Sequence, residues 1–248
     1  MGSHMADGDP GLITIAERVF PRYGFTPLEA DYVAMKDLSF KWSFRKKELR
    51  LFISDYLKGA PDYVIEDFVS GALHFIKTKE RCFDGAFAQY ARTDEFVLRT
   101  RPVYMSRMRS ITHDGQGNER SLYDSVQRLM DAGLVFPPDI DNTVFVWTKR
   151  PTYTRLGYCA TIVRLIVISC IFDDLNVDDR IVDYVVYHEI VHNRIGYRPF
   201  DRNPHDAQFK RYEKMYPDTE GINEELRQMT ASRPAENRRV NRHGRKRR

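Results

Sequence analysis

The sequence predicts an α+β fold in which a mixed or antiparallel sheet packs against one strongly patterned helix. Residues 143–172 contain three segments rich in β-branched and aromatic residues, which are typical of strands. Residues 177–195 follow and repeat apolar side chains at helical spacing, with Asp178 and Asp179 suited to the positive N-terminal end of a helix. Residues 40–55 alternate partly between apolar and polar, which favours a β-hairpin with Arg-Lys-Lys at its turn.

The first half of the chain contributes mixed signals and one clear helix. Residues 12–34 combine helical and turn features and are interrupted by prolines. In residues 62–76 the apolar side chains fall on one helical face, and Asp62 is the expected N-cap. Residues 113–120 form the most loop-like interior segment, so we expect a domain boundary there.

The second half predicts a helix, a cluster of strands and then the patterned helix. Residues 121–134 indicate a helix that begins after Ser121 and ends near Gly133. A further helix is expected to start near His205, which follows a proline. The strands are expected at 143–150, 152–160 and 162–172.

The chain is long enough for two small domains with cores of their own. We expect an N-terminal strand–helix region of unknown role at 6–115 and a second domain at 116–232. Residues 1–5, Met-Gly-Ser-His-Met, resemble the remnant of an expression vector and carry no structural meaning. Residues 233–248 hold eight basic residues and one acidic residue, which makes a basic tail of +7.

The basic tail, residues 233–248, is too polar to join a core, and we expect it to be disordered. Arginine pairs well with phosphate, so the tail is either a DNA- or RNA-binding segment without sequence preference or a solvated extension. The chain has a net charge of +4, so the remainder carries about 4 − 7 = −3. The basicity therefore belongs to the tail and not to the fold.

The composition indicates a globular protein that does not span a membrane. Hydrophobic residues make up 42% and charged residues 30% of the chain, and no apolar run approaches the ~20 residues of a membrane span. No secretory leader pattern follows residue 5. Cys82, Cys159 and Cys170 form no C-x-x-C pair, so we expect buried thiols in a reduced, cytoplasmic setting.

The predicted helix at 177–195 carries the pattern H-E-x-x-H at His188, Glu189 and His192. Residues four apart share one face of a helix, so both imidazoles can reach one zinc ion. Glu189 can then take a proton from water that the metal activates. The alternative is an amphipathic helix whose two histidines are satisfied core residues.

A catalytic zinc ion requires a third protein ligand. Two downstream residues qualify, His205 and Glu213, which lie eight positions apart on what the sequence predicts to be one helix. The spacing leaves both open, with one as the metal ligand and the other as a residue that supports a ligand. Hydrolysis also needs an oxyanion donor, for which Tyr197, Tyr212 and Arg155 are candidates beside their structural roles.

Residues 155–160, Arg-Leu-Gly-Tyr-Cys-Ala, together with the patterned helix and the segment from His205, resemble the YgjP-like and SprT-like small gluzincins. Those families share an R-W-G-x-C-like strand motif, an H-E-x-x-H helix, and a later helix that begins with histidine. In this chain Leu156 stands where the families have tryptophan. The matching residues are Arg155, Gly157, Cys159, Tyr184, Val185, Val186, His205 and Phe209.

The resemblance implies a zincin-like fold, in which an edge strand beside the active-site helix holds a peptide in extended form. It implies a zinc-dependent metallopeptidase, a hydrolase, with His188, His192 and His205 as metal ligands and Glu189 as general base. It favours His205 over Glu213 as third ligand. SprT-like proteases act on DNA-bound proteins, so the resemblance and the basic tail together make nucleic-acid-associated proteins a candidate substrate class.

Two other functions stay open from the sequence. One is a nucleic-acid-associated protein with a structural zinc ion, which a fourth protein ligand would favour. The other is a non-enzymatic interaction module with a degenerate zincin site, against which the intact Glu189 argues.

Overall fold

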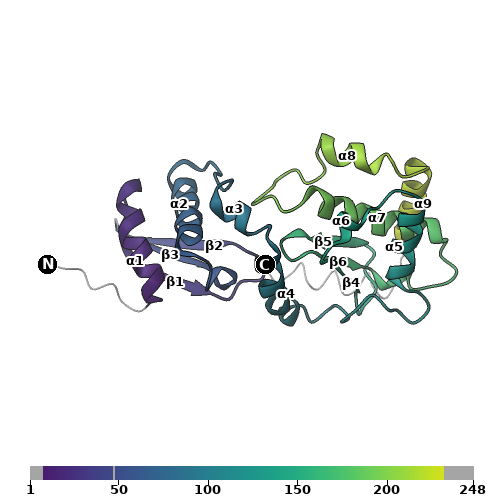
Figure 1. Ribbon diagram of the computed structural model, residues 1–248, viewed down its shortest axis with the longest axis horizontal. Helices are drawn as coiled ribbons and strands as arrows, with labels where there is room; N and C mark the ends of the chain where they lie inside the picture. The colour runs from purple at the N-terminus through teal and green to yellow at the C-terminus, as the bar shows by residue number, and fades with distance from the viewer. Residues whose placement is uncertain (1–7, 47, 232–248) are drawn as a thin grey trace. The chain divides into compact units, whose positions relative to one another are not determined.

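A computed structural model of the chain describes residues 8–46 and 48–231. The expected basic tail and the vector remnant both lie outside these residues. The helices and strands mix in the way expected of an α+β protein (Figure 1). Within the described part of the chain, no helix combines the length and the apolar character needed to cross a bilayer.

The described residues divide into two compact units. The first unit ends and the second begins between residues 107 and 108, whereas the sequence suggested a change of domain between 115 and 116. Residues 197–201 belong to the first unit, although the chain on both sides of them belongs to the second.

The first unit contains a three-stranded sheet with the order β1-β3-β2. Strands β2 and β3 pair antiparallel, which confirms the predicted hairpin, and β1 pairs parallel to β3. The elements of this unit are α1 (Pro10–Val19), β1 (Thr26–Val33), β2 (Phe40–Arg45), β3 (Glu48–Ser54), α2 (Asp62–Thr78), α3 (Ala86–Tyr90) and α4 (Asp94–Arg107).

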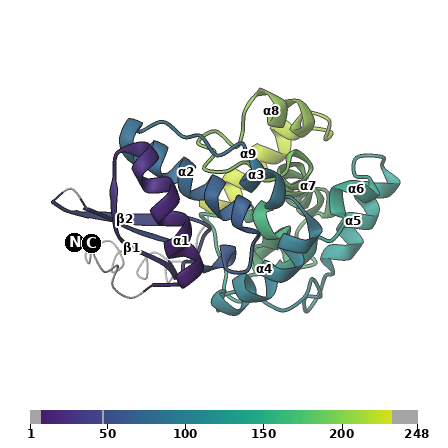
Figure 2. The ribbon, with the colours of Figure 1, turned by 60° about the vertical axis from the view of Figure 1, so that its left-hand side comes forward.

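One face of this sheet is covered by helices. Leu49, Leu51 and Ile53 alternate along β3 and are fully buried, because successive strand residues point to opposite faces. Helices α1 and α2 pack against each other on this side of the strands (Figures 1 and 2). The core of the first unit therefore lies between β3 and the two helices.

Helix α2 confirms the predicted helix at 62–76, but the predicted N-cap is wrong. Pro61 is the N-cap residue, with φ −57° and ψ 144°, and no side chain caps the helix. The proline ring fixes φ near this value, so the extended entry to the helix is set by Pro61. Asp62 becomes the first helical residue, where its charge still suits the helix dipole.

The second unit contains a three-stranded sheet with the order β4-β6-β5, in which β5 is antiparallel and β4 parallel to β6. Helix α7 packs on β5 and β6 and is itself surrounded by the other helices of the unit (Figure 1). The elements are α5 (Leu122–Asp131), α6 (Pro137–Ile140), β4 (Val144–Trp147), β5 (Gly157–Ala160), β6 (Leu165–Ile168), α7 (Asp179–Ile195), α8 (Ala207–Glu213) and α9 (Thr219–Ala231).

The predicted ends of α5 are confirmed. The Ser121 hydroxyl accepts a hydrogen bond from the amide of Tyr123 at 3.3 Å, which caps the N-terminus. Gly133 follows the helix with φ +69°, a conformation that costs glycine least. Helix α7 begins after Asp178, whose carboxylate accepts from the amide of Arg180 at 2.9 Å.

The three strands of this sheet are shorter than predicted. The segment between β4 and β5 contains three threonines, and part of its backbone bonds to hydroxyl groups. The Thr152 amide donates to the Ser169 hydroxyl at 3.1 Å, and the Arg155 carbonyl accepts from the Thr152 hydroxyl at 2.7 Å. Hydroxyls that satisfy backbone groups in this way compete with strand pairing.

The cysteines are unpaired, as expected, but they are not all buried. Cys82 is exposed, and Cys159 and Cys170 are partly buried. The expectation that all three are core residues is therefore wrong for Cys82, which lies just after α2.

Candidate metal centre

Helix α7 carries His188, Glu189 and His192 in the second unit, with the two histidines about one turn apart. His205 lies just before α8, and the N-cap of α8 is Asp206. The prediction that His205 and Glu213 share one helix is therefore wrong, because only Glu213 lies within α8. Asp206 accepts a hydrogen bond from the Phe209 amide at 2.9 Å and so fixes the start of α8 next to His205.

The side chains of His188, His192 and His205 form one group. Each offers a ring nitrogen, and these three nitrogens lie within 4.8 Å of one another. The Nε2 atoms of His192 and His205 are 3.0 Å apart. Two nitrogens bound to one tetrahedral zinc ion at ~2.0–2.1 Å would lie about 3.3 Å apart, so the observed spacing is close to that of zinc ligands.

The Phe209 ring contacts all three side chains of this histidine group. Its side chain is fully buried, and its ring centroid lies 4.8 Å from that of His188, 4.4 Å from that of His192 and 4.5 Å from that of His205. One aromatic ring thus holds three imidazoles from two chain segments against one another. Phe209 is one of the residues on which the resemblance to gluzincins depends, but the sequence alone did not indicate what its side chain contacts.

Glu213 does not join the ligand group but holds one of its members. Its Oε1 atom lies 2.9 Å from Nδ1 of His188 and accepts from the Tyr184 hydroxyl at 3.1 Å. Asn223 in turn donates to the Tyr184 hydroxyl at 3.1 Å. A carboxylate that accepts from Nδ1 leaves Nε2 of His188 for a metal ion, which is the common support for a histidine ligand.

The roles of Tyr184 and Asn223 were not predicted from the sequence. Tyr184 stands four residues before His188 on the same helical stripe, and that spacing is the signal that could have identified it. Asn223 lies on α9, a helix that the sequence analysis did not predict.

Burial and neighbouring charges keep His192 and His205 in the neutral form that binds metal. Burial, followed by the charges of His188 and His205, lowers the pKa of His192 to about 3. Burial also lowers the pKa of His205. Both imidazoles are therefore neutral at physiological pH, and neutral imidazole is the metal-ligating form. A donor set of three imidazole nitrogens fits zinc.

Glu189 is 5% exposed and lies against β5. Burial raises the pKa of Glu189 to about 7, although His188, Arg155 and the Cys159 amide oppose the shift by favouring the carboxylate. The strand approaches closely, since a Cβ on Gly157 would lie 2.8 Å from Oε1 of Glu189. The arrangement gives one buried carboxyl group beside a potential metal site, with a pKa suited to proton transfer near neutral pH.

The three oxyanion candidates differ in position. Arg155 is near enough to Glu189 for its charge to lower the pKa of that carboxyl group. The ring of Tyr212 packs 5.1 Å from the Arg194 guanidinium, and its carbonyl accepts from the Tyr187 hydroxyl. Tyr197 belongs to the first unit, where its ring lies 6.4 Å from that of Phe87. Arg155 is thus the candidate with an electrostatic link to the site.

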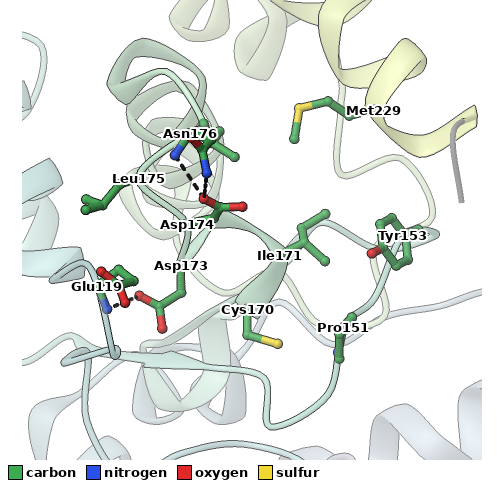
Figure 3. Close-up of a pocket in the computed structure, with 11 residues that line it drawn as sticks. Glu119, Pro151, Tyr153, Cys170, Ile171, Asp173, Asp174, Leu175, Asn176 and Met229 are labelled. Atoms are coloured by element: carbon green, nitrogen blue, oxygen red, sulfur yellow. Dashed lines mark hydrogen bonds between the residues drawn. The ribbon is translucent and has the colours of Figure 1, made fainter. Parts of the chain in front are cut away.

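A cavity of about 870 Å³ lies elsewhere in the second unit, and none of the predicted site residues line it. It lies beside the loop that leads into α7, and the Asp174 carboxylate in this loop accepts from Asn176 (Figure 3). The residues that line it are Glu119, Pro151, Tyr153, Cys170, Ile171, Asp173, Asp174, Leu175, Asn176, Val177 and Met229.

Known proteins do not assign this site. No protein-family model, curated protein or solved structure matches the chain. The interpretation of the histidine group therefore depends on the residues themselves.

Proposed function

We propose that this protein is a zinc-dependent metallopeptidase of the small gluzincin type, with a zincin-like domain that acts on peptides or proteins in the cytoplasm. His188, His192 and His205 would hold the zinc ion, and Glu189 would act as general base. A basic tail that binds DNA or RNA would bring nucleic-acid-associated proteins to the enzyme. The observation that carries the proposal is the group of three histidine nitrogens within 4.8 Å, with the buried Glu189 next to it.

A zinc ion bound there would supply a Lewis acid that activates water and polarises a peptide carbonyl. Glu189 would accept a proton from the attacking water and later deliver it to the leaving amine nitrogen. The Cys159 amide donates to the Glu189 carboxylate and so orients it. Glu213 would keep Nε2 of His188 directed at the metal by accepting from Nδ1.

Strand β5 supports the choice of a peptide as substrate. It is an edge strand of its sheet and packs against α7, next to Glu189. An edge strand can pair with an extended peptide through backbone hydrogen bonds. A peptide paired with β5 would pass close to Glu189.

The structural-zinc alternative requires a fourth protein ligand. Among the residues that the structure describes, the potential metal group comprises His188, His192 and His205 and no cysteine or carboxylate. Three protein ligands with an open position are typical of catalytic zinc sites. The composition of the group therefore favours the enzyme over the structural-zinc protein.

The test compares wild type with Glu189→Gln on unfolded protein substrates, with and without DNA. Glutamine keeps the size of the side chain but cannot take a proton, so peptidase activity should fall by about 10²–10⁴-fold. Zinc content should remain at the wild-type level, because the three histidines are intact. Wild-type turnover by zinc-loaded Glu189→Gln would contradict the proposed role of Glu189.

A further inference from the structure

Strand β2 forms an open edge of the sheet in the first unit. The strand order β1-β3-β2 places β2 at the end of the sheet, beside β3. Residues 41–45 are all exposed, and in the described part of the chain their backbone forms no hydrogen bond outside the pairing with β3. Every second residue of an edge strand points its N–H and C=O groups outward, where another extended chain can pair with them.

One face of this edge presents aromatic side chains. Trp42 and Phe44 pair with Leu51 and Leu49 of β3 and so share the face that is buried by the helices. The Trp42 ring lies 5.8 Å from that of Phe75 on α2. The helices leave the end of this face uncovered, because Trp42 remains 37% exposed and Phe44 52% exposed. An incoming apolar side chain would therefore find aromatic surface to cover.

The other face of the edge is positively charged. Lys41 and Arg45 alternate with the aromatic residues along β2 and therefore point to the opposite side of the sheet. Both are exposed. No salt bridge among the described residues neutralises either one, although Glu48 stands opposite Arg45 in the pairing with β3. Two positive charges on this face are thus available to an acidic partner.

The order of the side chains specifies a partner sequence. Residues 41–45 are basic, aromatic, serine, aromatic and basic. This order is the same in both directions, so parallel and antiparallel partner strands would meet the same side chains. A partner strand with acidic residues opposite Lys41 and Arg45 places its second and fourth residues opposite Trp42 and Phe44, where apolar side chains fit.

A second copy of the chain and a nucleic acid fit this edge less well. If β2 paired antiparallel with β2 of another copy in the central register, Lys41 of each copy would lie opposite Arg45 of the other, and like charges in that position are destabilising. Bases stacked on Trp42 would lie on the face opposite the two basic residues. Lys79, whose ammonium lies 5.7 Å from the Trp42 ring, already donates to the Ile76 carbonyl at 3.0 Å.

We infer that the outer edge of β2 binds an extended acidic segment of a partner protein as an additional strand. The segment has acidic residues at its first and fifth positions and apolar residues at its second and fourth. Backbone hydrogen bonds to β2 supply affinity, and the alternating side chains select the sequence. The inference gives the first unit a role in partner binding and does not depend on the metal centre.

The test measures the binding of fluorescent peptides to the full-length protein by anisotropy. The matching peptide contains Glu-Val-Thr-Val-Glu and the control contains Val-Glu-Thr-Glu-Val, each between Gly-Ser flanks. The two peptides have the same composition and charge, so attraction to the basic tail is equal for both. The matching peptide should bind roughly tenfold more tightly, because only its order makes all four cross-strand pairs favourable.

The Lys41→Gln/Arg45→Gln variant should bind the matching peptide roughly fivefold more weakly, since it loses two exposed ion pairs. Lys36→Gln/Lys58→Gln removes the same charge from exposed positions outside β2 and should bind like wild type. Equal affinities for the two peptides, or unchanged affinity in Lys41→Gln/Arg45→Gln, would overturn the inference.

The same variants distinguish the other occupants. Equal affinities for the two peptides, combined with weaker binding of a single-stranded oligonucleotide by Lys41→Gln/Arg45→Gln, would assign the edge to nucleic acid. A wild-type dimer in analytical ultracentrifugation that Phe44→Thr dissociates would assign it to a second copy of the chain. Either result would overturn the inference of an acidic protein segment.

Discussion

Gly157 shows how one residue couples a strand to a potential catalytic group. Its missing side chain lets β5 approach Glu189, since a Cβ there would lie 2.8 Å from Oε1 and 3.0 Å from Cγ of the glutamate. Real Cβ atoms essentially never make a contact of 2.8 Å, so the glutamate would have to move. Glu189 is buried and has little space into which to move.

Gly157→Ala should therefore displace the Glu189 carboxyl group and lower the rate of peptide hydrolysis by roughly 10²-fold, since small misplacements of catalytic groups have effects of this size. Zinc content should be unchanged, because the three histidines are intact. Gly11→Ala is the control, because its Cβ would meet only Asp9 at 3.4 Å. Full activity of Gly157→Ala would mean that the close approach is unrelated to catalysis.

The spacing of Glu213 in the sequence made it a candidate third metal ligand but could not decide between it and His205. The sequence left it and His205 as alternative third ligands, and the difference depends on side-chain directions that only the folded α8 defines. His205 belongs to the histidine group that could hold a metal ion, and Glu213 lies against Nδ1 of His188. The contacts of Glu213 therefore indicate that it orients His188 and does not itself bind a metal ion.

Glu213→Gln should weaken zinc binding by about 10–100-fold, the usual effect of removing an acceptor behind a histidine ligand. Competition with a fluorescent zinc chelator would measure the change in affinity. Glu220→Gln removes an exposed carboxylate for which no contact is seen and should bind zinc like wild type. An unchanged zinc affinity in Glu213→Gln would show that the carboxylate does not support the ligand.

At the scale of elements, α7 is held by arginine–carboxylate pairs along its length. Arg120 pairs with Asp179 at its start, Arg128 with Asp183 one turn later, and Arg194 near its end with Asp139 of α6. The Arg194–Asp139 pair is bidentate, at 2.7 and 2.8 Å, and both side chains are nearly buried. These contacts fix the position of the helix that carries the H-E-x-x-H residues.

Asp139→Ala should destabilise the protein by roughly 3–5 kcal/mol, because it leaves the Arg194 charge buried without its partner. Chemical denaturation of the zinc-free protein would measure the loss. Asp141→Ala removes an exposed carboxylate two residues away and should change stability by less than about 0.5 kcal/mol. Equal stability of the two variants would show that the pair does not anchor α7.

The sequence predicted α5 and α7 well because their apolar residues repeat with helical spacing and their caps are local. It predicted the β2–β3 hairpin because the turn joins adjacent strands. The parallel pairings β1–β3 and β4–β6 join strands that are not neighbours in sequence, so no local pattern indicates them. The strand predicted at 152–160 shrank to Gly157–Ala160, because hydroxyl groups take the backbone partners that a strand would need.

At the scale of the whole molecule, a short segment after α7 belongs to the first unit. Within that unit the ring of Phe200 lies 4.4 Å from that of Phe83, and Arg92 donates to the Tyr197 carbonyl at 2.9 Å. No periodicity in the sequence signals this exchange, because it depends on contacts between distant residues.

The basic tail provides a prediction for the full-length molecule. Deletion of residues 233–248 removes a charge of +7 and should weaken binding to DNA or RNA at low salt without lowering the melting temperature. Binding by the intact chain should fall steeply as salt rises, because it depends on counterion release. Equal binding by the truncated and intact proteins, measured by anisotropy across a salt series, would exclude the tail as the binding segment.

The central claim is that His188, His192 and His205 hold one zinc ion, and elemental analysis of the purified full-length protein tests it most directly. The expected result is about one zinc ion per chain, with most of it lost in His205→Ala and all of it kept in His74→Ala, a histidine on α2 outside the group. Only trace zinc in the wild type would contradict the claim. So would full zinc in His205→Ala combined with its loss in Glu213→Ala.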